Sequence, residues 1–191
     1  MGRRGLALLA ALCLLALPAL AEVDTAVLDA DTGLAAYPDD NGVDLIWRPL
    51  DQPFQGTAEE GMAVAFLDFA ELANEGVVAL RFVLTLQLDE ALYADTLALR
   101  AGKKSWTFAV RPVTTEYDAV YQEDYTVPLG PAGLEMVQAL AKNAGGTVSF
   151  TLEGGRTVSG TLAIPADRAA AVWKLYKAIG GPKQDLSVLE E

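Results

Sequence analysis

The sequence contains no histidine, and its single cysteine is Cys13, close to the N-terminus. Histidine is the commonest general base near neutral pH and a common metal ligand, so the chain lacks the residue type that most often fills these two roles. Basic residues are also scarce, with 14 Lys and Arg against 26 Asp and Glu and a formal net charge of −12. Because phosphate binding needs a basic surface, this acidity excludes the nucleic-acid-binding class.

The first 21 residues have the three-part pattern of a secretory signal peptide. Arg3 and Arg4 precede an apolar run of 12 residues, and Ala19 and Ala21 form an A-x-A cleavage site. A membrane-spanning helix needs about 20 apolar residues, and neither this run nor a later one reaches that length. The alternatives are a retained N-terminal anchor, for which no stop-transfer flank follows, and a lipoprotein at Cys13, which a Leu precedes in place of a small residue.

We therefore expect cleavage after Ala21 and a location in the periplasm or outside the cell. The mature chain would have no transmembrane segment, no cysteine and a formal charge of −14. Disulfides and cysteine catalysis are thereby excluded for the mature form, and side-chain packing must stabilise the fold.

Alternating hydrophobicity predicts several strands. The clearest run is Val77–Leu88, in which every second residue is Val, Leu or Phe, while the opposite face is mostly polar. Residues 147–152 and 157–164 also alternate, and the Gly-Gly between them favours a hairpin. Pro131–Asn143 and the segment from Pro165 to Ile179 have helical spacing, and Pro165 fits a first helical position. The sequence thus predicts an α+β fold, with a β-rich antiparallel sheet or sandwich and two C-terminal helices.

The chain divides into four predicted parts by composition. Residues 1–21 are the signal peptide, 22–42 an acidic irregular lead-in, 43–181 a single β-rich domain and 182–191 a loose polar tail. Within the domain, residues 51–61 contain Pro and Gly and are expected to be a loop. Residues 62–72 fit a strand or a helix equally well.

Four aspartates in the lead-in are the candidate metal ligands, namely Asp29, Asp31, Asp39 and Asp40. Calcium is bound by six to eight oxygens, but the spacing here departs from a calcium-binding helical loop, and a solvated acidic loop is the favoured interpretation of the cluster. The tripeptide Asp31-Thr-Gly also occurs in aspartic proteases, whose chemistry needs two carboxylates that share a proton. Only one such tripeptide is present, so no catalytic residue is assigned.

Three tyrosines recur every fourth residue, interleaved with acids: Tyr117, Tyr121 and Tyr125. On a helix they would form one aromatic stripe, and tyrosine combines an apolar ring with a polar hydroxyl. This stripe is the candidate surface for a protein partner, and packing of the rings onto the sheet is the alternative interpretation.

The order of elements in the last third of the chain resembles a known family. Val127–Gly130, a helix through Leu140, two alternating strands around a Gly-Gly turn and an Ala-rich helix are similar to the C-terminal half of the invasion-associated locus B family of secreted bacterial proteins. The similarity spans residues 127–180. It implies a β-rich secreted protein without an established catalytic site. The chain departs from the family in lacking mature cysteines and in having Pro165-Ala166 where Gly-Phe is common.

The expected function is that of a non-catalytic binding or accessory protein without a cofactor, whose partner is a basic or neutral protein. The absence of histidine, of mature cysteine and of a convincing carboxylate pair supports this expectation. Two alternatives are a carboxylate-dependent hydrolase of the aspartyl type and an acidic inhibitor of a basic envelope enzyme.

Overall fold

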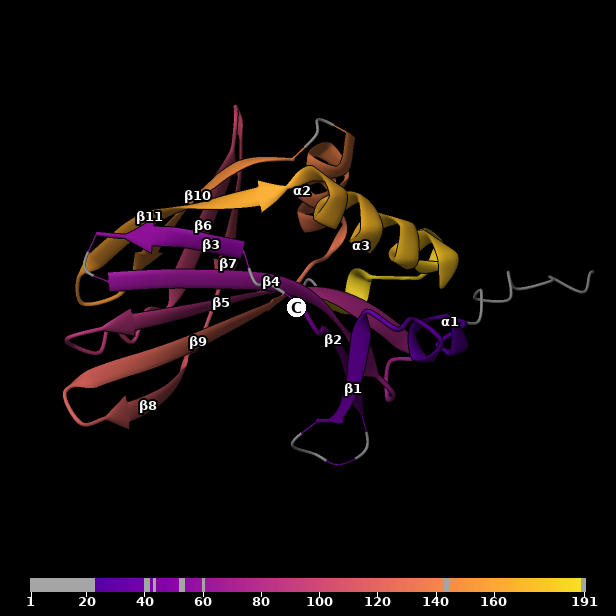
Figure 1. Cartoon of the computed structure of the whole chain (residues 1–191), viewed down its shortest axis with the longest axis horizontal. Coiled ribbons are helices and arrows are strands. Elements are labelled where there is room, and N and C mark those ends of the chain that lie inside the picture. The colour runs from indigo at the N-terminus through magenta and orange to yellow at the C-terminus, as the bar shows by residue number, and fades with distance from the viewer. Residues whose placement is uncertain are drawn as a thin grey trace, which may run out of the picture.

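The described part of the chain forms one large antiparallel β-sheet, and two helices lie in the C-terminal third of the chain. Figure 1 shows this arrangement in the computed structural model. The structure describes residues 23–39, 42, 44–51, 54–59, 61–142 and 145–189. The expected signal peptide, residues 1–21, lies outside the described residues. The predicted α+β class with a β-rich antiparallel sheet is confirmed.

The sheet contains eleven strands in the described residues, and nine of them follow the order β7-β6-β10-β11-β3-β4-β5-β9-β8. β2 pairs with β4 beside this path, and β1 pairs with β2. The bounds are β1 Leu34–Pro38, β2 Leu45–Pro49, β3 Phe54–Ala58, β4 Gly61–Leu72, β5 Val77–Leu88, β6 Thr96–Ala101, β7 Lys104–Ala109, β8 Val113–Tyr117, β9 Val120–Pro128, β10 Gly145–Glu153 and β11 Thr157–Pro165.

The sheet is split along one edge of β4. β3 pairs with the first half of β4 and stops at Ala65, whereas β2 pairs with the second half from Phe69. Among the described residues, the three between Ala65 and Phe69 have no neighbouring strand on this side. Figure 1 shows β3 toward one end of β4 and the β1–β2 hairpin toward the other. This split positions the candidate site.

Two helices pack on the sheet, and α3 lies over the split. α2 spans Pro131–Lys142 and α3 spans Ala166–Ala178, close to the predicted bounds. They pack against each other, and α3 also contacts β10, β11 and the short helix α1, Ala26–Asp29. Pro165 ends β11 and is the N-cap of α3, one position before the expected one, because its extended backbone completes the strand.

The core lies on the inner face of the curved sheet. In β5 the predicted apolar face, from Val78 to Leu88, is buried. Side chains from strands far apart in the order, such as Trp106 of β7, Tyr125 of β9 and Phe150 of β10, belong to the same buried cluster. The opposite face of β5 is less exposed to solvent than predicted, since Ala79 and Val83 are buried as well.

Three predicted irregular segments contain regular structure. The lead-in 22–42 contains α1 and β1, and the expected loop 51–61 contains β3. The expected loose tail 182–191 contains most of the 3-10 helix η1 (Gly181–Lys183) and all of the 3-10 helix η2 (Ser187–Leu189). In the tail Gln184 accepts a hydrogen bond from the Val78 N–H at 2.6 Å and donates to the Val78 carbonyl at 3.2 Å. Gln184 therefore joins the tail to β5.

No helix within the described ranges combines the length and the apolar character that crossing a membrane requires.

Candidate functional site

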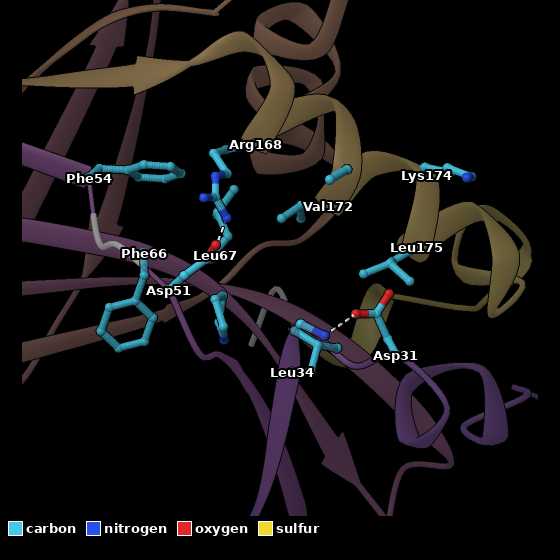
Figure 2. A pocket seen from close by; sticks show the side chains of 13 residues that line it. Asp31, Leu34, Asp51, Phe54, Phe66, Leu67, Arg168, Val172, Lys174 and Leu175 are labelled. Carbon is cyan, nitrogen blue, oxygen red and sulfur yellow. Dashed lines mark hydrogen bonds and ion pairs between the residues drawn. The ribbon is translucent and has the colours of Figure 1, made fainter.

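A pocket of about 270 Å³ lies between α3 and the split edge of β4 (Figure 2). It forms where β2 and β3 part, so the floor comes from β4 and the roof from α3. Most of the lining is apolar, from Leu34, Pro49, Phe54, Phe66, Leu67, Ala171, Val172 and Leu175. The arrangement is a concave apolar site with a few polar groups, which is typical of small-molecule binding.

Helical spacing brings the roof of the pocket together. Arg168, Ala171, Val172 and Leu175 are three or four residues apart on α3, so they lie on one face of the helix. Ala171 is exposed at the rim, while Val172 and Leu175 are half-buried and pack against the core. The small side chain at residue 171 therefore leaves the pocket open to solvent.

An ion pair lies at one end of the pocket. The Arg168 guanidinium donates to the Asp51 carboxylate, which joins the first turn of α3 to the segment after β2. This hydrogen bond and the positive charge of Arg168 hold the pKa of Asp51 below its ordinary value. Both side chains are substantially exposed, so the pair adds little to stability.

The second carboxylate of the pocket belongs to Asp31, the first residue of the Asp-Thr-Gly tripeptide. Its Oδ1 atom accepts a hydrogen bond from the Gly33 N–H at 2.8 Å. This is a tight turn in which an aspartate side chain bonds the backbone two residues later. Figure 2 shows Asp31 and Asp51 at opposite ends of the pocket. The two carboxylates are therefore not placed to share a proton, which the aspartyl mechanism requires.

The four candidate metal ligands are not brought together in the described residues. Asp29 accepts a hydrogen bond from the Trp47 indole N–H at 2.8 Å, and Asp31 lies before β1. Asp39 follows β1, and five strand residues span roughly 17 Å. Asp40 lies outside the described residues. In the part of the chain that the structure describes, no three His, Cys, Asp or Glu side chains are grouped as metal ligands.

The three candidate tyrosines lie on a hairpin and not on a helix, so the interpretation as one aromatic stripe is wrong. Tyr117 ends β8 and is exposed, while Tyr121 and Tyr125 lie on the same face of β9. Tyr125 is fully buried in the core, and Tyr121 is half-buried. The structure therefore places Tyr125 in the packing role and leaves Tyr117 as the accessible ring of the set.

Tyr125 is hydrogen-bonded to Glu123, a buried acid that was not identified from the sequence. The Tyr125 hydroxyl donates to Glu123 at 2.5 Å, and Glu123 also accepts the backbone N–H groups of Leu92 and Tyr93 at 3.0 and 2.8 Å. These bonds fasten the segment before β6, where Tyr93 has a positive φ of 50°. Alternation along β9 places Glu123 on the inner face between Tyr121 and Tyr125, and this alternation was the available signal.

Tyr125 is expected to stay neutral in alkaline solution while the protein is folded. Burial, reinforced by the hydrogen bond to Glu123, raises the pKa of Tyr125 well above its ordinary value. We expect the tyrosinate absorbance of the wild type and of Tyr125→Phe to superimpose between about pH 10 and 12. Circular dichroism over the same range checks that both proteins remain folded. A smaller absorbance rise in Tyr125→Phe would contradict the buried position.

The residues that line the pocket were not identified as a site from the sequence. Helical spacing predicted that Arg168, Val172 and Leu175 lie on a helix, but it did not indicate a site. Asp51 and Phe54 fall in a segment that was expected to be a loop. Comparison with known proteins gives no match among family models, curated proteins or solved structures.

Proposed function

We propose that this chain is a non-catalytic binding protein, acting in the periplasm or outside the cell, that holds a small molecule with an apolar body in the pocket between α3 and β4. The observation that carries this proposal is the apolar lining of the pocket, interrupted at one end by the exposed Arg168–Asp51 pair. The location rests on the signal-peptide pattern of residues 1–21. The resemblance to the invasion-associated locus B family stays a prediction and adds nothing to the argument from geometry.

The polar groups of the pocket favour binding over catalysis. Asp51 is paired with Arg168, and Asp31 is bonded to its own turn, so neither carboxylate is set up as a general base or a nucleophile. Arg168 presents a planar fork that recognises carboxylates, and Asp51 can accept from an amine or a hydroxyl. A ligand with a polar head would therefore orient that head toward this pair.

The size of the pocket limits the ligand. About 270 Å³ lies just below the usual range for drug-sized sites of roughly 300–1,000 Å³. Each methylene removed from water contributes about 0.8 kcal/mol, so a chain of about eight carbons supplies most of the binding free energy. Affinities between micromolar and millimolar follow, after the entropy lost on association.

Blocking the pocket is expected to abolish this binding. Ala171 lines the rim, and Ala171→Trp would place an indole over the apolar wall. Calorimetric titration with octanoate, octylamine and octanol should show saturable one-to-one binding of at least one probe to the wild type. The same probe should bind Ala171→Trp at least about tenfold more weakly, a change of about 1.4 kcal/mol.

Ala170→Trp is the matched control, because Ala170 is the preceding residue of α3, is exposed and does not line the pocket. It should bind as the wild type does. Failure of all three probes to bind the wild type, or equal binding by Ala171→Trp and the wild type, would refute the proposed function.

A further inference from the structure

One edge of the sheet is open for pairing. β8 is the last strand of the order, and among the described residues it pairs only with β9. Figure 1 shows β8 at the lower border of the sheet with no labelled element beyond it. The backbone on its free side therefore offers N–H and C=O groups to another strand. We propose that β8 pairs antiparallel with β8 of a second copy of this chain, across a two-fold axis at Thr115.

The sequence of β8 is self-complementary in this register. With Thr115 facing itself, Val113 of each copy faces Tyr117 of the other, and Thr114 faces Glu116. Aromatic–β-branched and Thr–Thr pairs are favourable across antiparallel strands. Glu116 never faces its own copy, so the single charge of the strand meets a hydroxyl and not a like charge. A two-fold contact requires this kind of self-match.

Residues of opposite charge flank β8. Arg111 precedes the strand and Asp118 follows it, and both are exposed. Antiparallel pairing centred on Thr115 sets Arg111 of one copy opposite Ala119 of the other and Asp118 opposite Pro112, so charges of opposite sign lie at the same end of the paired strands.

Two exposed side chains of β8 are more apolar than is usual for an edge strand. Val113 is 69% exposed and Tyr117 is 58% exposed. Natural sheets usually protect an exposed edge with lysine, proline or a covering element. β7, at the other end of the order, begins with Lys104, which bridges to Glu135 of α2 at 2.7 Å. β8 has no lysine or proline within its five residues, and its one charge is Glu116, although Pro112 immediately precedes it.

The dimer would be weak and would depend on salt. One pair of five-residue strands is smaller than a standard interface, so we expect a dissociation constant on the order of 10–100 µM. Each copy carries a formal charge of −12, or −14 after removal of the signal, so the copies repel at long range. Added salt screens this repulsion, and association should therefore strengthen as salt rises from about 0.01 M to 0.15 M.

Sedimentation equilibrium tests the proposal on the mature chain. We expect wild type to show a monomer–dimer equilibrium, and Thr115→Lys, which sets two ammonium groups against each other at the axis, to associate at least about tenfold more weakly. Thr161→Lys is the matched control, because Thr161 is an exposed threonine on the interior strand β11. It has the same change of charge and should dimerise like the wild type.

A mixing experiment makes the result independent of the stability of one variant. Thr115→Lys and Thr115→Glu should each be monomeric alone, and an equimolar mixture should form heterodimers, because opposite charges then meet at the axis. A wild type that stays monomeric up to about 100 µM would overturn the proposal. Assembly beyond the dimer, or a mixture that stays monomeric, would overturn it as well.

Discussion

The Phe150→Ala variant is expected to lose about 3–5 kcal/mol of its free energy of unfolding. Phe150 is 1% exposed on β10, whose two neighbours are β6 and β11. Its ring lies over Gly160, where an added Cβ would be 2.4 Å from the ring Cζ atom. Because strands hold the backbone on both sides, the space left by the ring cannot collapse, and the variant keeps a cavity.

Denaturant unfolding followed by circular dichroism measures this loss. Thr151→Ala is the matched control, since Thr151 is the next residue, points to the outer face and has its hydroxyl 3.2 Å from that of Ser159. We expect the control to lose no more than about 1 kcal/mol. Equal stability of Phe150→Ala and the wild type would show that the register of β10 is wrong.

Arg81→Met is expected to destabilise the protein by about 3 kcal/mol, because it leaves a buried carboxylate without its main partner. Asp68 of β4 is fully buried and faces Arg81 of β5. The Arg81 Nε and Nη2 atoms donate to the two Asp68 carboxylate oxygens at 2.8 and 2.7 Å. Arg48 contacts the same carboxylate at 3.4 Å, which keeps the loss near the lower end of the usual range.

Two further variants separate the buried pair from ordinary loss of packing. Arg48→Met removes the outer arginine, which is 43% exposed against 13% for Arg81, and should have a cost below about 1 kcal/mol. The double variant Asp68→Leu/Arg81→Met removes both charges, and it should recover most of the stability lost in Arg81→Met. If thermal unfolding found Arg81→Met and Arg48→Met equally stable, the buried pair would not have the assigned importance.

The elements that the sequence predicted correctly are those defined by local spacing. The twelve-residue alternation of β5, the β10–β11 hairpin and the two C-terminal helices all follow from contacts between residues near each other in the chain. β3 was missed because Gly56 indicated a loop. In the structure an added Cβ at Gly56 would lie 2.0 Å from the Thr161 carbonyl oxygen, so the glycine lets β3 and β11 approach. The approaching strand lies about a hundred residues away, and no local pattern shows it.

The tyrosine interpretation failed for a different reason. A spacing of four residues is an even number, so it brings side chains to one face of a strand as well as to one face of a helix. The choice between the two depends on pairing partners, which only the fold supplies. The pocket has the same dependence: Arg168 and Asp51 are 117 residues apart, and its walls come from segments that approach only in the folded sheet.

The position of β3 between β4 and β11 also determines the order in which the fold can be completed. During synthesis β3 and β4 emerge early, but the Thr57–Thr161 pair needs roughly a hundred further residues. β6 likewise waits for β10. Chains dominated by such distant pairings fold slowly, on the order of milliseconds to seconds. The entropy of closing a long loop is lost before the stabilising contacts form. The sheet therefore cannot be completed until the last third of the chain, which supplies β10 and β11, has been made.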